Sequence, residues 1–359
     1  MKRLSTLQLV PGMTVAQDVF TMDRQQVFTK GTVLTDKLIT KLDLYGIFTI
    51  YVEDSLPAPI APTVAPREPS YSQRIKSDAC FRHFKDEYEL SVDSLKNMIS
   101  TVVERNLQLD IKELLKNTLR ILGIDRGHIG ILDMLQNMRE YDDSTFAHSI
   151  NVALICNILA GWLKWAPEQV ELATACGLLH DIGKLEVPHD IISKPGRLSA
   201  EEFSLIQKHP SSGYQILQNQ HLDHHICNAA LMHHERCDGS GYPMKLKGPA
   251  IDNYARLVAI VDVYDAMTAA RVYRGPLCPF RVIEIFESEG LQKYDVEYLL
   301  VFLENVVNTY IQNRCLLSDG RKGDIIYINK DHLSRPIVQC GTEYVNLAEH
   351  PDLSIASLL

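Results

Sequence analysis

The stretch LLHDIGKLEVP, residues 178–188, places a histidine and an aspartate side by side at the end of an apolar run. His180 and Asp181 close the segment ELATACGLLHD, so we expect them where a buried helix ends. Burying an imidazole and a carboxylate is costly unless they coordinate a metal ion or are fully hydrogen-bonded. The pair alone therefore leaves two interpretations open, a metal site and a polar cap on the helix end.

Two further residues in this stretch bear on that choice. Adjacent helical residues point about 100° apart, so the pair can converge only on a point between their directions, which suits a metal ion. Lys184 follows the pair at the spacing of one helical turn and should share its face. Gly183 has no side chain and is expected to leave space for a ligand. The expected arrangement is a cation beside a metal.

Histidines are concentrated around this stretch, because nine of the thirteen lie between positions 148 and 234. His148 lies in AHSINVALICNILAGWL, whose apolar spacing predicts a helix. His224 and His225 precede a second histidine pair but lack the carboxylate and turns that follow that pair. We therefore expect them at the surface or beside a helix.

The second histidine pair lies in LMHHERCDGSGYP, residues 231–243. His233 and His234 are followed by Glu235, an Asp-Gly turn and a Gly-Tyr-Pro turn. Imidazole pairs suit iron, manganese or zinc, and a carboxylate shared by two ions suits a binuclear site. Arg236 and Asp238 could form an exposed ion pair.

A predicted helix downstream, NYARLVAIVDVYDAMTAARVYR, adds two carboxylates within an apolar surround. Asp262 and Asp265 are three residues apart and should share one helix face. Arg271 and Arg274 follow just beyond them.

These motifs, in this order, resemble the HD-GYP subfamily of HD-domain phosphohydrolases. The resemblance covers residues 140–285, and the string HHExxDGxGYP is its most specific part. The residues that carry it are His148, His180-Asp181-x-x-Lys184, His209-Pro210, His233-His234-Glu235, Asp238-Gly239-x-Gly241-Tyr242-Pro243, Asp262 and Arg271-x-Tyr273-Arg274.

The resemblance implies a mainly helical HD fold that hydrolyses cyclic di-GMP to linear pGpG or GMP with divalent metal ions, iron or manganese. Asp181 and Lys184 are then the catalytic residues, with Asp181 bridging two ions, and Glu235 shapes the loop. The implied metal ligands are His148, His180 and Asp262 for one ion, and His209, His233 and His234 for the other. The implied substrate-binding residues are Lys184, Asp265, Arg271, Arg274, Gly241, Tyr242 and Pro243.

One position departs from the family pattern. Family members with three metals carry a glutamate four residues before the first ligand histidine, and this chain has Ser144 there. A serine hydroxyl is a poor ligand for a hard metal, so we predict two ions. Two ions about 3.5 to 4 Å apart can share a hydroxide and direct it at a phosphodiester phosphorus. No Cys-His or Ser-His-Asp arrangement stands out as a protein nucleophile.

Other functions remain open at this point. An HD phosphohydrolase for another cyclic dinucleotide or a nucleotide would keep the metal ligands and change the base pocket. A non-catalytic signalling module would bind the nucleotide, or a protein partner, through the GYP loop. A di-iron oxygenase on the same fold would show redox turnover instead of hydrolysis. The complete ligand set favours the phosphodiesterase.

Composition limits the setting in which the protein acts. The chain has 359 residues, 46% of them hydrophobic and 23% charged, with a net charge of -9. That charge provides no general attraction for DNA, RNA or an anionic membrane. The N-terminus lacks the apolar core of a signal peptide, and no uncharged apolar run of about 18 residues stands out. We expect a cytoplasmic protein whose eight widely spaced cysteines are free.

The pattern along the chain predicts five segments. Residues 1–54 form a small α+β module with β-like runs at 15–20, 26–29 and 48–52 and a helix at 35–46. Residues 55–70 contain five prolines and predict an extended linker. The remaining segments are a helical connector at 71–130, which could pack between modules or form a homodimer, an almost wholly helical catalytic domain at 131–310, and a short β segment at 311–359, expected as a hairpin.

Overall fold

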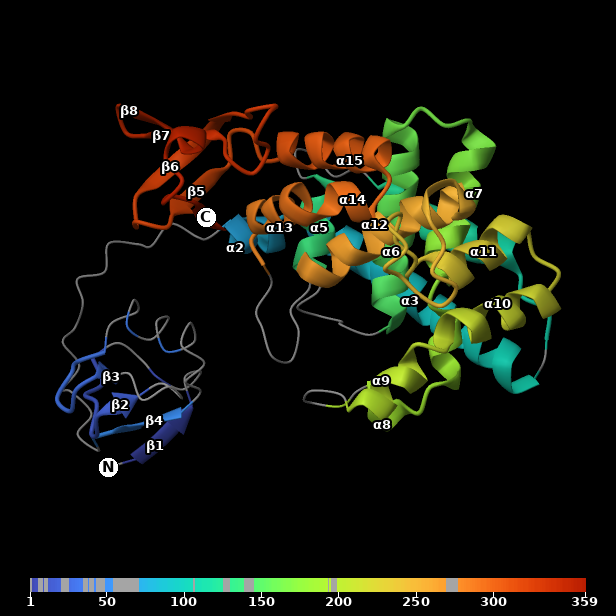
Figure 1. Cartoon of the computed structure of the whole chain (residues 1–359), viewed down its shortest axis with the longest axis horizontal. Helices are drawn as coiled ribbons and strands as arrows, with labels where there is room; N and C mark the ends of the chain where they lie inside the picture. Colours follow the sequence, from blue (N-terminus) through green and yellow to red (C-terminus); the bar gives the residue numbers. More distant parts are fainter. Residues whose placement is uncertain are drawn as a thin grey trace. The chain divides into compact units, whose positions relative to one another are not determined.

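The computed structural model describes residues 2–5, 9, 12–20, 26–34, 38, 42, 49–53, 71–105, 107–124, 130–138, 145–192, 194, 199–268 and 277–359. The chain divides into two compact units, Met1–Glu68 and Pro69–Leu359. The larger unit is mainly helical and ends in strands, and the smaller unit contains short strands (Figure 1). The mainly α fold class is confirmed, whereas the division into five segments stays a prediction.

Two antiparallel strand pairs form the described part of the smaller unit. β1 (Lys2–Ser5) pairs with β4 (Thr49–Val52), and β2 (Val19–Phe20) pairs with β3 (Gln26–Phe28). Apolar side chains of this unit enclose a small core of their own. The three expected β runs are present but shorter, and β1 is an additional strand. Apart from Leu38 and Leu42, the expected helix at 35–46 lies outside the described residues.

The larger unit begins with a long succession of helices, which Figure 1 shows packed against one another. In chain order these are α2 (Tyr71–Ser77), α3 (Ala79–Arg105), α4 (Ile111–Leu122), α5 (Ile131–Met138), α6 (Thr145–Trp162), α7 (Pro167–Leu179), the 3-10 helix η2 (Ile182–Glu186), α8 (His189–Ile192), α9 (Ala200–Ile206), α10 (His209–Asn219), α11 (His224–Met232), the 3-10 helix η3 (Gly248–Ala250), α12 (Asn253–Thr268), α13 (Pro279–Ile285), the π-helix η4 (Phe286–Gly290), α14 (Leu291–Lys293) and α15 (Val296–Asn308).

Helix α6 lies at the centre of this unit and packs against α3, α7, α12 and α15. Because it is covered on several sides, apolar residues occur around most of its circumference. Among the described residues, α6 is the one helix long and apolar enough to cross a membrane by length and composition. Within the fold, 61% of that stretch is buried, as expected for a core helix.

The C-terminal residues form a five-stranded antiparallel sheet, so the predicted β segment is confirmed but is larger than the expected hairpin. Its strands are β5 (Arg314–Leu317), β6 (Lys322–Tyr327), β7 (Ile337–Cys340), β8 (Glu343–Asn346) and β9 (Ile355–Leu358), in the order β8-β7-β6-β5-β9. The last strand returns to pair with the first, and such a long-range pairing leaves no local sequence signal. The apolar face of the sheet shares one core with the helices.

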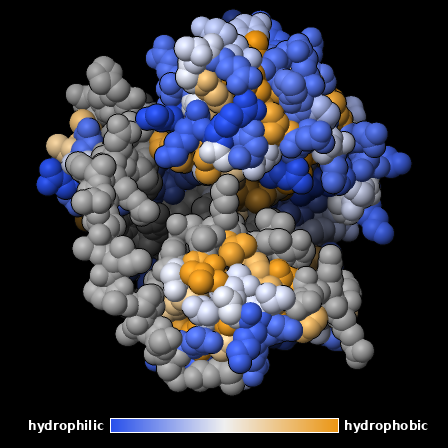
Figure 2. All heavy atoms as spheres, turned by 90° about the vertical axis from the view of Figure 1, so that its left-hand side faces the viewer, coloured by the Kyte–Doolittle hydropathy of each residue, from blue (hydrophilic) through white to orange (hydrophobic). Residues whose placement is uncertain are grey.

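Polar side chains cover much of the described surface. Figure 2 shows a largely hydrophilic face with hydrophobic side chains interspersed, which agrees with the composition of the chain. The eight cysteines are all free thiols. The surface and the thiols both match what the composition predicts.

Helix α3 of the expected connector packs directly on the central helix. The hydroxyl oxygen of Tyr88, which is 1% exposed, lies 2.7 Å from Oδ1 of Asn151 and 3.0 Å from the carbonyl oxygen of Ala147. Both partners belong to α6. The connector is therefore part of the same hydrophobic core as α6, and its role in a homodimer stays a prediction.

We expect Tyr88→Phe to lower the free energy of unfolding by about 1 to 3 kcal/mol, because buried acceptors on α6 lose their donor. Urea denaturation followed by circular dichroism measures this change. Tyr344→Phe is the matched control, since Tyr344 is 65% exposed. Equal unfolding midpoints for the two variants would show that the hydrogen bonds of Tyr88 to α6 do not stabilise the packing of α3 on α6.

Candidate metal centre

All seven side chains predicted to ligate metals gather at one place, although they come from six elements. The donor atoms form two groups, and within each group they lie within 4.8 Å of one another. The first group comprises His148 of α6, His180 at the end of α7 and Asp262 of α12, and the second comprises Asp181 at the start of η2, His209 at the start of α10, and His233 and His234 directly after α11.

Asp181 stands between the two groups. Its Oδ2 lies 3.3 Å from Nε2 of His180 and 3.7 Å from Nε2 of His148. Its Oδ1 lies 3.3 Å from Nε2 of His209 and 3.7 Å from Nε2 of His233. One carboxylate thus directs one oxygen toward each group, which is the geometry of a ligand shared by two ions.

Main-chain carbonyls hold three of the imidazole rings from behind. Nδ1 of His180, His209 and His233 lies 2.7, 2.7 and 3.0 Å, respectively, from a carbonyl oxygen. A carbonyl only accepts, so Nδ1 carries the proton in each ring and Nε2 keeps its lone pair. Histidines that bind metals are oriented in this way by a hydrogen bond on the outer nitrogen.

Buried atoms in the centre lack hydrogen-bond partners within the described part of the chain. Nε2 of His180 and Oδ1 of Asp181 are two such atoms. His180 is wholly buried and Asp181 is 2% exposed. An unpaired buried polar atom costs about 1 to 3 kcal/mol, and more if it is charged. A divalent cation accepts both lone pairs, so these residues fit the metal that the sequence implies.

Burial and neighbouring charges set the protonation of the second group. Burial holds the pKa of His233 well below its usual value, and burial lowers the pKa of His234 to about 3. Burial opposes ionisation of Asp181, but the charge of Lys184 and the neighbouring imidazoles together outweigh burial and keep the pKa of Asp181 well below its ordinary value. Neutral imidazoles and an ionised carboxylate are the forms that bind metals.

The first group favours positive charge. Burial tends to lower the pKa of His148, but hydrogen bonds to Asp262 and Asp265 outweigh burial and raise this pKa to about 10. Burial tends to raise the pKa of Asp262, but the hydrogen bond with His148 helps to hold this pKa well below its ordinary value. Asp262 would stabilise either a proton on Nε2 of His148 or a bound cation, whereas Asp265 contacts Nδ1 of that ring.

Asp265 lies behind His148, on the side away from the other ligands. Its Oδ2 lies 2.8 Å from Nδ1 of His148, whereas Nε2 of that ring lies 3.1 Å from Oδ1 of Asp262. Asp265 is only 2% exposed. The predicted contact with substrate requires a surface that Asp265 does not present, and its position favours orienting His148 instead.

Lys184 and Gly183 lie in η2, directly after the His-Asp pair. The Lys184 ammonium lies 2.5 Å from Oδ2 of Asp181, and 26% of its side chain is exposed. Gly183 does not leave space for a ligand as expected, because a Cβ there would lie 2.0 Å from the carbonyl oxygen of His209. Glycine is required because η2 and α10 approach so closely, and this approach sets the position of His209.

The loop after His234 folds back on the second group. Glu235, 1% exposed, accepts hydrogen bonds from the main-chain N–H groups at positions 244 and 246, at 2.6 and 3.0 Å. The Tyr242 ring stacks on His234, with centroids 4.7 Å apart. A Cβ on Gly241 would lie 2.4 Å from Cα of Glu235, so the loop can return here only with glycine. Pro243 follows a cis peptide bond.

Some predicted residues are not placed at the centre. Ser144, Arg271 and Arg274 lie outside the described residues, so their roles stay predictions. His224 and His225 lie at the other end of α11 from the centre, where the His224 side chain is 74% exposed. These positions fit the surface role expected for that pair.

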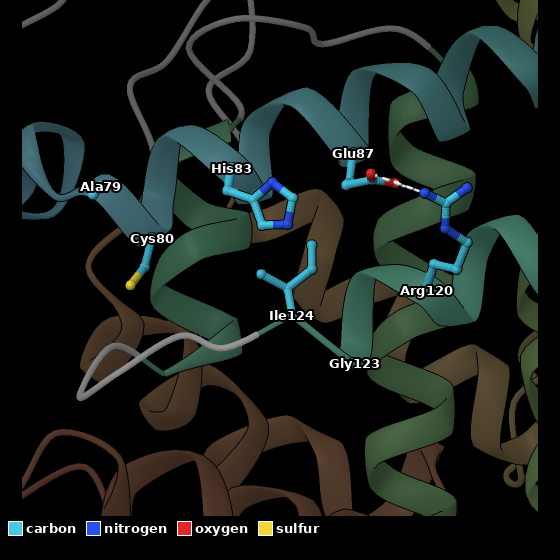
Figure 3. Close-up of a pocket in the computed structure, with 7 residues that line it drawn as sticks. All are labelled: Ala79, Cys80, His83, Glu87, Arg120, Gly123 and Ile124. Atoms are coloured by element: carbon cyan, nitrogen blue, oxygen red, sulfur yellow. Dashed lines mark hydrogen bonds and ion pairs between the residues drawn. The ribbon is translucent and has the colours of Figure 1, made fainter.

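A separate hollow of about 640 Å³ lies between α3 and the end of α4 (Figure 3). The side chains of His83 and Ile124 point toward each other between the helices, and Arg120 forms an ion pair with Glu87. None of the predicted site residues lines this hollow, so we assign it no part in the chemistry. Its lining residues are Ala79, Cys80, His83, Glu87, Arg120, Gly123 and Ile124.

We expect Gly183→Ala to weaken metal binding, because the added methyl group can be accommodated only if α10 and His209 move away. The loss of affinity for Mn²⁺ should be about 10-fold or more, the range found when groups that orient metal ligands are removed. Equilibrium dialysis of metal-free protein measures it.

Gly161→Ala is the matched control for this prediction. A Cβ at Gly161, in the last turn of α6, has no neighbour within 4 Å. This variant should bind Mn²⁺ as the unaltered protein does. If both alanine variants bind Mn²⁺ equally well, the contact between η2 and α10 does not position His209.

Comparison with known proteins gives one family match and several curated relatives. Residues 129–298 match the family described as HD domain. The chain is 43% identical over 145 residues to the 3'3'-cGAMP-specific phosphodiesterase 1 of Vibrio cholerae, covering 40% of this chain and 34% of that protein. It is 39% identical to the cyclic di-GMP phosphodiesterase PA4108 of Pseudomonas aeruginosa, covering 41% and 36%.

A third relative is the cyclic di-GMP phosphodiesterase response regulator RpfG of Xanthomonas campestris, 38% identical over 40% of this chain and 39% of that protein. The chain thus spans between 34% and 39% of the length of these three relatives. Within residues 129–298, however, the family match, the clustered His and Asp side chains and the GYP loop agree. This segment of the chain matches the HD domain family and carries the His, Asp and GYP motifs that resemble the HD-GYP type.

Proposed function

We propose that this protein is a metal-dependent phosphodiesterase that hydrolyses cyclic di-GMP to linear pGpG, GMP or both. Two divalent ions, iron or manganese, would serve as cofactors. The observation that carries the proposal is the Asp181 carboxylate, whose two oxygens face separate groups of ligand side chains. The proposal is also supported by the relatives of the HD segment, three of which are named as phosphodiesterases of cyclic dinucleotides.

The proposed division of ligands follows the two groups of donor atoms. His148, His180 and Asp262 would hold one ion, His209, His233 and His234 the other, and Asp181 both. The predicted absence of a third ion rests on Ser144.

When bound, two such ions activate a water molecule and stabilise the negative charge that develops as the phosphodiester bond breaks. The residues of the chain hold and orient the reacting groups. Hydrogen bonds on Nδ1 prevent the imidazole rings of His180, His209 and His233 from rotating. Lys184 is partly exposed beside Asp181, so its ammonium can contact a phosphate oxygen as a point charge.

The GYP loop provides the proposed contact surface for the nucleotide. Gly241, Tyr242 and Pro243 belong to this loop, and the Tyr242 ring stacks on the imidazole of His234. Arg271 and Arg274 would add positive charge for the phosphates. A cytoplasmic location, where a soluble cyclic dinucleotide would reach this site, is part of the proposal.

A second candidate substrate is 3'3'-cGAMP. One relative at 43% identity is named as specific for it. The two substrates differ in one base and share the phosphodiester groups that bound ions would contact, so the centre described above would serve either. A direct comparison of the two substrates decides between them.

The first test is turnover by protein reconstituted anaerobically with iron or manganese. Cyclic di-GMP and 3'3'-cGAMP are supplied separately, products are separated by chromatography, and metal is counted in the same sample. We expect linear dinucleotide or mononucleotide and about two ions per chain. Two bound ions without any product would contradict the phosphodiesterase and favour a nucleotide-binding module.

We expect Asp181→Asn to reduce the bound metal from about two ions to one or fewer, because the shared carboxylate loses its charge. Hydrolysis should fall with the metal content, since the two ions together would supply the activated water and the charge stabilisation. Metal analysis and turnover are measured on the same preparation. Asp93→Asn, at an exposed position of α3, is the control. A folded Asp181→Asn protein with its full metal content would show that Asp181 is not a ligand.

A further inference from the structure

The turn that follows α11 poses a geometric problem that the metal ligands alone do not solve. His233 and His234 are adjacent in the chain, yet both rings belong to one group, with centroids 4.1 Å apart. Side chains of adjacent residues in a regular helix diverge by about 100°. The helix must therefore end at Met232, and the following turn must keep a shape that brings the two rings together.

Ending the helix leaves main-chain carbonyls without helical donors. The carbonyl of His234 accepts a hydrogen bond from the N–H of Tyr242 at 3.2 Å. The carbonyls of His233 and Glu235 are both taken by one nitrogen of Arg236, at 3.1 and 2.9 Å. A single side chain therefore holds the carbonyl groups on both sides of His234.

Arg236 is itself held in place from outside the turn. Its guanidinium lies over the Tyr294 ring, 5.0 Å from the centroid, and Tyr294 is 9% exposed. The neighbouring N–H of Cys237 donates to the carbonyl of Lys293 at 2.8 Å. The adjacent residues Lys293 and Tyr294 therefore each make one contact that supports the turn. The exposed ion pair with Asp238 that the sequence suggested is therefore replaced by these contacts.

We propose that Arg236, supported by Tyr294, is a positioning residue of the metal centre. By holding the carbonyls of His233 and Glu235, it keeps the turn in the shape that directs His233 and His234 to the same ion. Arg236 is not a ligand and does not contact substrate. The inference rests on the proposed function: the Mn²⁺ test requires only that the second group binds a metal ion, and the turnover test also requires the phosphodiesterase activity.

The test measures Mn²⁺ affinity of the full-length protein by competition with a chelator, without any nucleotide. Arg236→Ala should bind Mn²⁺ about 10- to 100-fold more weakly, as found for other groups that orient metal ligands. Arg236→Lys lacks the planar fork, so it should also lose Mn²⁺ affinity. Because it keeps the charge, this loss should be smaller than that of Arg236→Ala. Arg120→Ala is the control, because Arg120 is 57% exposed in a surface ion pair.

Tyr294→Leu provides an independent variant in case Arg236→Ala does not fold. It removes the ring that supports Arg236 and leaves Arg236 and every ligand intact, so Mn²⁺ affinity should again fall. Unaltered affinity in folded Arg236→Ala, or in Tyr294→Leu if the former does not fold, would overturn the inference. Failure of the unaltered protein to bind Mn²⁺ would instead overturn the metal centre itself, and with it this inference.

Turnover gives a second readout that a purely structural role would not change. With excess Mn²⁺, Arg236→Ala should recover its kcat with KM unchanged, because the defect lies in ligand geometry. A raised KM that excess metal does not correct would show that Arg236 contacts the substrate, contrary to the inference.

Discussion

The centre depends on one buried anion, the Asp181 carboxylate, which faces two groups of imidazoles at once. It is 2% exposed, so water cannot replace the groups around it. Each of its oxygens lies 3.3 Å from the Nε2 atom of one histidine, and those histidines come from different helices. The helices must therefore meet at fixed distances from a single side chain. This requirement explains why η2 approaches α10 so closely that only glycine fits at position 183.

Helix ends satisfy this requirement. His180, His209 and His233 each lie at the first residue of a helix or directly after the last one. A helix end leaves carbonyls without donors, and the Nδ1–H of each of these histidines donates to a carbonyl three residues before it. The same hydrogen bond therefore satisfies the helix end and turns Nε2 toward the centre. Adjacent side chains can converge at these places because the chain leaves its helical path there.

The cost of polar residues in apolar surroundings drew attention to His180 and Asp262, and the resemblance to the HD-GYP subfamily supplied the expected ligand set. Residues whose role depends on a neighbour far along the chain were misread. Gly183 shows only a missing side chain, and the carbonyl of His209 that occupies the space comes from another helix. Arg236 has Asp238 nearby in sequence, whereas its actual support is Tyr294. Asp265 had been placed toward the substrate, yet it lies behind His148.

The fold class was readable from local patterns, and the proposed chemistry follows from the resemblance that the motifs carry. Three- and four-residue apolar spacing predicts helices, and the order of His, Asp and GYP motifs indicates a metal-dependent phosphohydrolase. Packing settled the remaining features: the return of β9 to β5, the two-sided position of Asp181 and the contacts that hold each imidazole. The physical reason is that spacing along a chain encodes which face of an element a residue occupies. The atoms that meet this face belong to distant segments and become neighbours only when the helices pack.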